Sequence, residues 1–154
     1  MNKNSSKLEP LGKYLSIAYR ALNSYLDREL EEYDIARGQL PFLIALYHKE
    51  GVSQQQLCKY YNLDKATAGR AISKLIDIGL VKREKDPEDR RQYNIYLTEK
   101  GREFKPLFLD ILKSSEERMK KNLSEEELFQ FMNTLEKIIN NLGVEKIDSW
   151  CKKE

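Results

Sequence analysis

The stretch from Asp86 to Gly101 reads DPEDRRQYNIYLTEKG, and it decides the fold. It opens with a charged segment that a proline interrupts and that carries Arg90 and Arg91. Residues 92–97 then alternate in the manner of a β-strand, and residues 80–83 upstream form a matching short strand. The loop between them is too long and too charged for a tight turn. The sequence therefore predicts a β-hairpin with an exposed basic loop, followed by a helix.

Two short helices precede this hairpin. Ser53, with Gln56 three residues later, predicts a capping box at the start of the first helix, which ends near Asn62. Asp64 caps the second helix, over about residues 65–78, and a glycine ends it. Helix, short turn and helix is the helix-turn-helix arrangement. A helix fills the major groove of DNA and an arginine fits the minor groove, so this succession indicates a DNA-binding protein.

Longer helices flank this central part. Apolar residues over 8–32 recur by three and four, and the same spacing returns in a helix that begins at Ser124. A largely apolar helix over about 39–49 is predicted to be buried, and another helix covers 98–122. Each apolar stripe suits either an intramolecular core or an interface between two copies of the chain. We predict a mainly α protein with a small β wing (α+β), with a winged helix-turn-helix lobe over residues 35–99 and a helical dimerisation region made of residues 1–34 and 100–154.

Composition narrows the class of protein. The chain has 154 residues, of which 34% are charged and 40% hydrophobic, as expected for a globular protein. Its net charge is only +2, so a basic face has to come from the placement of charges rather than from their excess. No run of about 18 apolar residues predicts a membrane span, and the first ten residues lack the apolar core of a signal peptide. Two widely separated cysteines, Cys58 and Cys151, favour a reducing cytoplasm.

The chain resembles the MarR (multiple antibiotic resistance regulator) family of winged-helix transcription factors, nearly from end to end. The resemblance is carried by the start and end of the second short helix and by the wing pattern: Asp64-Lys65-Ala66-Thr67, Gly79-Leu80-Val81, and Asp89-Arg90-Arg91 followed by Ile95, Leu97-Thr98 and Gly101. It implies a homodimer in which the N- and C-terminal helices interlock. Two lobes would then reach an inverted-repeat operator on double-stranded DNA, most often as a repressor.

The candidate DNA contacts fall into three groups. They lie at the start of the first short helix (Ser53, Gln54), along the second helix (Lys65, Ala66, Thr67, Gly69, Arg70, Lys74), and on the wing (Asp89, Arg90, Arg91). Arg70 is the candidate for a guanine contact, since a guanidinium bonds two acceptors on the edge of that base. Arg91 is the candidate for a narrow minor groove. By the family pattern, Asp89 pairs with Arg91 and fixes its direction.

Some of these residues also have a purely structural explanation. A glycine inside a helix costs about 1 kcal/mol relative to alanine, and Gly69 suits either close approach to DNA or close packing of two helices. Ser53 is both a helix cap and a candidate phosphate contact, because free amides at a helix N-terminus attract anions. Thr67 can donate to a phosphate or touch a thymine methyl group.

An effector site is a weaker expectation. The resemblance implies a small aromatic or phenolic ligand between the arms and the lobes, and Tyr14, Tyr19, Tyr47 and His48 are its candidate contacts, although aromatic residues at helical spacing also suit a core. His48 is the only histidine, and a zinc site needs about four ligands, so we expect no metal and no cofactor. Relatives that sense peroxide use a cysteine in the first helix. Here no cysteine precedes Cys58, which we expect to be structural.

Two other functional classes compete with this hypothesis. An enzyme is disfavoured because the sequence contains neither a phosphate-cradling glycine loop nor the residues of a nucleophilic triad beyond His48. A winged-helix adaptor that binds another protein fits the low net charge. Salt dependence separates the adaptor from a DNA-binding protein, because phosphates release counterions when a protein binds them.

Overall fold

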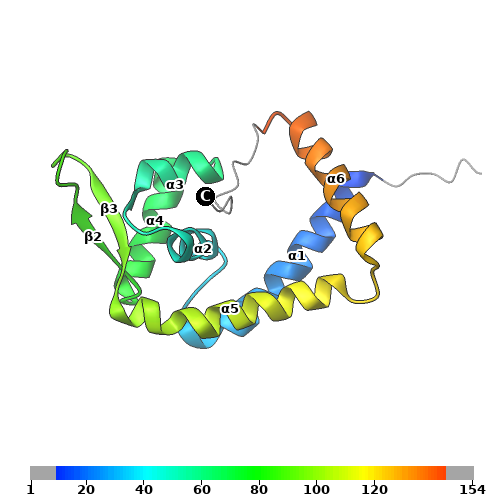
Figure 1. The fold of residues 1–154 in the computed structure, drawn as a ribbon, viewed down its shortest axis with the longest axis horizontal. Helices are drawn as coiled ribbons and strands as arrows, with labels where there is room; N and C mark the ends of the chain where they lie inside the picture. The colour runs from blue at the N-terminus through cyan, green and yellow to red at the C-terminus, as the bar shows by residue number, and fades with distance from the viewer. Residues whose placement is uncertain (1–9, 145–154) are drawn as a thin grey trace, which may run out of the picture.

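The computed structural model describes residues 10–144. It is mainly helical, with one small sheet, and has the shape of a lobe carried on a helical arm (Figure 1). The winged-helix expectation is confirmed. The predicted start of the first helix at Leu8 lies outside the described residues; the helix that the structure shows, α1, spans Leu11–Leu30 and continues into a 3-10 turn, Glu31–Tyr33.

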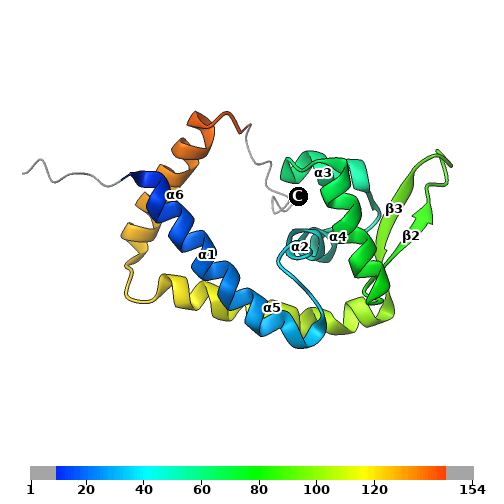
Figure 2. The same ribbon diagram turned by 180° about the vertical axis from the view of Figure 1, so that it is seen from behind.

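The lobe contains three helices and three strands. In chain order these are α2 (Leu40–His48), β1 (Val52–Ser53), α3 (Gln54–Tyr61), α4 (Lys65–Asp77), β2 (Val81–Lys85) and β3 (Tyr93–Leu97). The sheet is antiparallel in the order β1-β3-β2, and β2 and β3 form the hairpin that projects from the lobe in Figures 1 and 2. Strand β1 was not predicted: two residues are too few to show an alternating pattern, and Val52 pairs with distant Ile95.

Local sequence signals place the ends of the lobe helices. Ser53 Oγ accepts from Gln56 N at 3.1 Å while Ser53 N donates to Gln56 Oε1 at 2.8 Å, which is the predicted capping box of α3. Asn62 ends α3 with a left-handed backbone, at a φ of 49°, and so turns the chain toward α4. Asp64 caps α4 by accepting from Thr67 N at 2.8 Å. The helix-turn-helix is therefore built by short-range hydrogen bonds.

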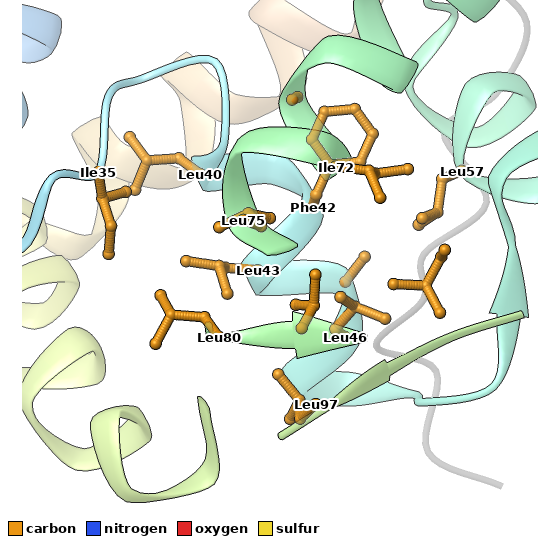
Figure 3. Close-up of a cluster of buried hydrophobic side chains, with 14 of the residues drawn as sticks. Ile35, Leu40, Phe42, Leu43, Leu46, Leu57, Ile72, Leu75, Leu80 and Leu97 are labelled. Atoms are coloured by element: carbon orange, nitrogen blue, oxygen red, sulfur yellow. The ribbon is translucent and has the colours of Figure 1, made fainter. Parts of the chain in front are cut away.

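The core of the lobe lies where α2, α3, α4 and the sheet meet. Phe42 and Leu43 of α2 face Ile72 and Leu75 of α4, with Leu57 of α3 nearby (Figure 3). All five side chains are fully buried. Burying a side chain of this size stabilises the fold by about 1.5–3 kcal/mol, so the orientation of α4 on the lobe is fixed by packing.

The arm consists of α1, α5 (Glu99–Lys120) and α6 (Glu125–Asn141). Helix α5 starts in the lobe and runs along α1, and α6 folds back from the far end of α5 (Figures 1 and 2). Leu26 and Leu30 of α1 and Phe108 and Ile111 of α5 are buried between the two helices. In the part of the chain that the structure describes, no helix is both long and apolar enough to cross a membrane.

The first turns of α5 are bound firmly to the lobe. Tyr47 Oη donates to Gly101 O at 2.9 Å, and Arg102 forms an ion pair with Glu50 at 3.1 Å. Glu50 also accepts from Leu97 N at 3.0 Å. Gly101 allows this approach, because a Cβ at that position would lie 2.1 Å from Leu80 O. The arm and the lobe are thus joined by an ion pair, by side-chain hydrogen bonds to the backbone and by close backbone packing at Gly101.

Helix α6 is different from the others, because none of its side chains is buried in the protomer. Phe129 and Phe131 are 68% and 57% exposed, and Leu142, just beyond the helix, is 75% exposed. Ser124 begins this helix with the second predicted capping box. This helix has a well-formed cap, but its apolar residues are at most half-buried, so much of its apolar surface stays uncovered by the described residues.

Candidate nucleic-acid interface

Helix α4 presents one face to solvent. Lys65, Ala66, Arg70 and Lys74 are exposed on it, whereas Thr67 and Gly69 are half-buried. This face borders a shallow groove of about 790 Å³, which we call the recognition groove; its lining is Gln54, Lys65, Ala66, Gly69, Arg70, Ser73, Lys74, Asp77 and Arg83. Five of the six predicted residues of α4 therefore line one groove, with Gln54 of α3 beside them, and Thr67 is not part of the lining.

A second groove lies between α3 and the hairpin. It also measures about 790 Å³, and we call it the wing groove; it is lined by Ser53, Gln54, Gln55, Cys58, Lys65, Arg83, Arg91, Gln92, Tyr93 and Ile95. Gln54, Lys65 and Arg83 line both grooves, so the two are adjacent. Arg83 thus places a positive charge between the recognition helix α4 and the wing arginine Arg91.

Sequence reasoning missed Arg83. A signal for it did exist in the strand pattern. Alternate residues of a strand lie on the same face, so Arg83 shares a face with buried Val81, and its partner across the hairpin, Ile95, is also buried. A positively charged residue is unusual on the face of a strand that packs toward the helices. Here the charge of Arg83 reaches the edge of the recognition groove.

The predicted residues at the start of α3 have structural roles in the protomer. Ser53 is 8% exposed, and its hydroxyl is engaged in the cap. Gln54 Nε2 donates to Lys65 O at 3.2 Å and so links the starts of α3 and α4. Gln54 lines both grooves and Ser53 lines the wing groove, at a helix N-terminus whose free amides attract anions.

The wing tip is organised by two carboxylates. Asp86 accepts from the backbone amides of Glu88 at 2.7 Å and Asp89 at 3.0 Å, and from Asn94 Nδ2 at 2.8 Å. The hydrogen bond from the Asp89 amide is the largest of the effects that lower the pKa of Asp86, followed by that from Asn94. Asp86 is therefore charged at neutral pH and holds the turn that precedes Arg90.

The pairing of Asp89 with Arg91 takes a different form from the one the family pattern implies. Asp89 Oδ1 accepts from the backbone amide of Arg91 at 3.0 Å, and its Oδ2 accepts from Gln92 Nε2 at 3.2 Å. Asp89 consequently shapes the loop around Arg91 through the main chain. Arg90 and Arg91 are both exposed, with Arg91 at the wing groove.

The four candidate effector contacts do not gather in one cleft of the protomer. Tyr14 and Tyr19 lie exposed on the N-terminal half of α1, whereas Tyr47 and His48 end α2 in the lobe. Tyr47 packs on Phe108 and donates its hydroxyl to α5, and burial raises its pKa to about 12. Among residues 10–144 no group of three or more His, Cys, Asp or Glu side chains is arranged to hold a metal ion. Cys58 is a half-buried free thiol in the wing groove.

The fold and this basic face together define a winged helix-turn-helix protein of the DNA-binding class. The MarR family profile matches residues 33–92. A MarR transcriptional regulator from Methanosarcina mazei Go1 is 37% identical, with a TM-score of 0.79 over 88% of this chain and 98% of that one. A putative MarR family regulator from Listeria monocytogenes, solved in complex with a 26mer DNA, is 26% identical, with a TM-score of 0.79 over 93% of each chain.

A curated relative, the uncharacterised HTH-type transcriptional regulator YybA of Bacillus subtilis, is 34% identical over 57% of this chain. The match spans 59% of that relative's length. The chain belongs to the MarR family. The family and these relatives are transcriptional regulators rather than enzymes.

Proposed function

We propose that this protein is a cytoplasmic transcriptional repressor that binds an inverted-repeat operator as a homodimer. The observation that carries the proposal is the adjacency of the recognition groove and the wing groove, which share Lys65 and Arg83. A duplex that places its major groove on α4 brings the next minor groove to the wing, so the phosphates between them pass Arg83. Lys65, Arg70, Lys74, Arg83 and Arg91 thus line two neighbouring grooves on one face.

Base reading is assigned to Arg70 and minor-groove binding to Arg91. Arg70 stands exposed in the middle of α4, and a bidentate contact to guanine is worth about 1–3 kcal/mol of discrimination. Lys65, Lys74, Arg83 and Arg90 supply phosphate contacts, which set affinity and register but carry no base preference. Gln54 and Ser53 add amide donors at the start of α3.

Dimerisation is assigned to the arm. The apolar stripe of α6 is at most half-buried in the protomer, and α1 adds exposed Leu11, Tyr14 and Ile17. Stripes of this kind normally pack against another helix. The arm of a second copy offers the same apolar stripe and is therefore a self-complementary partner. The resulting dimer would hold two lobes at the separation of about 34–36 Å that successive major grooves require.

The proposal also includes an effector, a small aromatic ligand whose binding makes the protein dissociate from the operator. It is supported by the exposed rings of Tyr14 and Tyr19 on the arm. Tyr47 and His48 lie in the lobe, so a ligand that touched both groups would have to sit where one protomer's arm meets a lobe. Tyr47 would offer its ring, since its hydroxyl is bound to Gly101.

The test is selection of duplexes from a random pool with the full chain, followed by titration of the selected duplex over a range of salt concentrations. We expect an inverted repeat and a steep loss of affinity with salt. Arg70→Ala should abolish preference at one base position in each half-site. Arg91→Ala should weaken binding and flatten the salt slope by roughly one per lost contact. Lys113→Ala, on the exposed face of α5, is the control.

A protein-binding adaptor would give the opposite result. It would enrich no duplex, and its weak binding at low salt would be unaffected by Arg70→Ala. An enriched inverted repeat that the Arg70 and Arg91 variants bind like wild type would retain the DNA-binding function and overturn the assignment of the contacts.

A further inference from the structure

Arg70 is held by a neighbour on its own helix. Its Nη2 donates to Thr67 Oγ1 at 3.2 Å, one turn closer to the start of α4. An exposed arginine ordinarily samples many rotamers and loses that freedom when it binds. A contact that restrains Arg70 before DNA arrives reduces this loss.

The contact depends on where Thr67 sends its only hydroxyl proton. Thr67 Oγ1 donates to Asp64 Oδ2 at 2.5 Å. A hydroxyl has one donor and two acceptor sites, so toward Arg70 this oxygen acts only as an acceptor. The sequence had left Thr67 free to donate to a phosphate, but its proton is already engaged. Its methyl group is not.

The carboxylate of Asp64 has two separate tasks. Oδ1 accepts from Thr67 N at 2.8 Å and caps the helix, and this bond alone would satisfy a capping role. Oδ2 receives the hydroxyl, which capping does not require. The side-chain hydrogen bond from Thr67 is the largest cause of the lowered pKa of Asp64, and the positive charge of Arg70 lowers it further. Asp64 is thus a permanent acceptor at neutral pH.

We propose that Asp64 and Thr67 are positioning residues for Arg70, and that two consecutive hydrogen bonds preset its guanidinium for the base that it reads. The inference rests on the proposed DNA-binding function. It assigns base preference at one position of the operator to two residues that need not contact that base.

Thr67→Val is the direct test. It removes the hydroxyl, keeps a branched side chain with a methyl group, and leaves the Asp64 cap to the backbone amide intact. Thr67→Ser restores the hydroxyl. Asp64→Ser keeps a good cap residue but has a single neutral oxygen, so it removes the second carboxylate oxygen, which accepts the Thr67 hydroxyl. Circular dichroism and thermal unfolding verify that each variant is folded.

The readout is the ratio of Kd values for single-base variants of the selected duplex to that of the duplex itself. The position read by Arg70 is the one at which Arg70→Ala loses discrimination. At that position Thr67→Val and Asp64→Ser should each lower the ratio of Kd values by a factor of about 2 to 12, the range of one net hydrogen bond. Thr67→Ser should leave the ratio unchanged. A purely structural role would weaken binding to all duplexes alike.

A double-mutant cycle completes the test. If Thr67 acts through Arg70, adding Thr67→Val to Arg70→Ala changes the ratio no further. An equal loss in both backgrounds, a loss at another position, or an unchanged ratio in Thr67→Val overturns the inference. Failure of the wild-type chain to enrich any duplex would instead overturn the proposed function, so the two failures are distinguishable.

Discussion

The side-chain amide of Gln54 lies directly over Gly69. A Cβ added to Gly69 would stand 3.3 Å from Gln54 Nε2, and the same nitrogen donates to Lys65 O at 3.2 Å. This contact gives the glycine within α4 a reason in helix packing, which was one of the two explanations that the sequence left open. Close approach to DNA is the other, and the two make different predictions for an alanine at position 69.

Gly69→Ala should not destabilise the protein. The atom that a methyl group would meet is the far end of a flexible side chain, which can move by the few tenths of an ångström required. Alanine also gains up to about 1 kcal/mol in helix propensity over glycine. We expect the free energy of unfolding in urea to be unchanged or higher. In a Gln54→Ala background, where the contact is absent, Gly69→Ala should raise the free energy of unfolding by the full gain in helix propensity.

DNA binding by the same variant separates the two explanations. If the DNA backbone lies against Gly69, the Ala variant should be at least as stable as wild type and yet bind the selected duplex more weakly. Equal affinity would leave Gln54 as the reason for the glycine. A large loss of stability would contradict the expectation that Gln54 moves aside, and would favour the packing explanation.

Gly101→Ala should have the opposite effect on stability. Its Cβ would lie 2.1 Å from the backbone oxygen of Leu80, and a buried backbone atom that already accepts a hydrogen bond from Thr98 N cannot swing aside. Overpacking of this kind costs about 1–3 kcal/mol, occasionally more. Urea unfolding should show the loss, whereas Gly12→Ala, with nothing within 4 Å of its Cβ, should show none. Equal midpoints for the Gly101 variant and wild type would contradict this account of the junction of arm and lobe.

Features that depend on neighbours along the chain could be predicted from the sequence. The caps at Ser53, Asp64 and Ser124 are local hydrogen bonds between residues three apart, and all three form as predicted. The hairpin and the helix-turn-helix follow from similar short-range patterns. Repetition of apolar residues by three and four also revealed α1 and α6.

Features that depend on distant partners could not be predicted. Strand β1 exists because Val52 meets Ile95, and Gly101 is required because Leu80 passes close to it. Arg83 belongs to the basic face only because the hairpin turns it toward α4. The candidate effector residues lie apart within one protomer, and the sequence could not show this because spacing along separate helices does not fix where those helices meet.

Tyr47→Phe should change the pH dependence of stability at high pH. Burial raises the pKa of Tyr47 to about 12, above its ordinary value of 10.0. Below pH 10 the phenol is protonated in both states. Between about pH 10 and 12 the unfolded chain releases this proton while the folded one keeps it, so the free energy of unfolding falls as pH rises.

The Tyr47→Phe variant has no phenol proton to titrate. At neutral pH it should be less stable by about 0.5–1.5 kcal/mol, because the hydrogen bond to Gly101 O is lost. Its stability should then decline less steeply than that of wild type between pH 9 and 11.5 in urea titrations. Tyr19→Phe, on the exposed ring, is the control. Parallel pH profiles for wild type and Tyr47→Phe would show that Tyr47 is not responsible for the alkaline loss.

Phe131→Glu should dissociate the proposed dimer without unfolding the protomer. No side chain of α6 is buried within one chain, and Phe131 is 57% exposed, so a charge at position 131 stays hydrated in the monomer. In a dimer the same carboxylate would be buried without a partner, at a cost of several kcal/mol. Sedimentation should therefore show a monomer for this variant and a dimer for wild type. Because one lobe reaches one half-site, the variant should also bind a duplex with a single half-site about as well as the full inverted repeat.

Asn133→Glu provides the matched control, since it adds the same charge to the same helix. Residues two apart do not share a helix face, so position 133 points away from the stripe that contains Phe131. The control should remain dimeric, and its new carboxylate gains a favourable neighbour in Lys137, four residues on. Dissociation by both variants would implicate the charge of the whole helix rather than its apolar stripe. A dimeric Phe131→Glu protein would place the interface elsewhere on the arm.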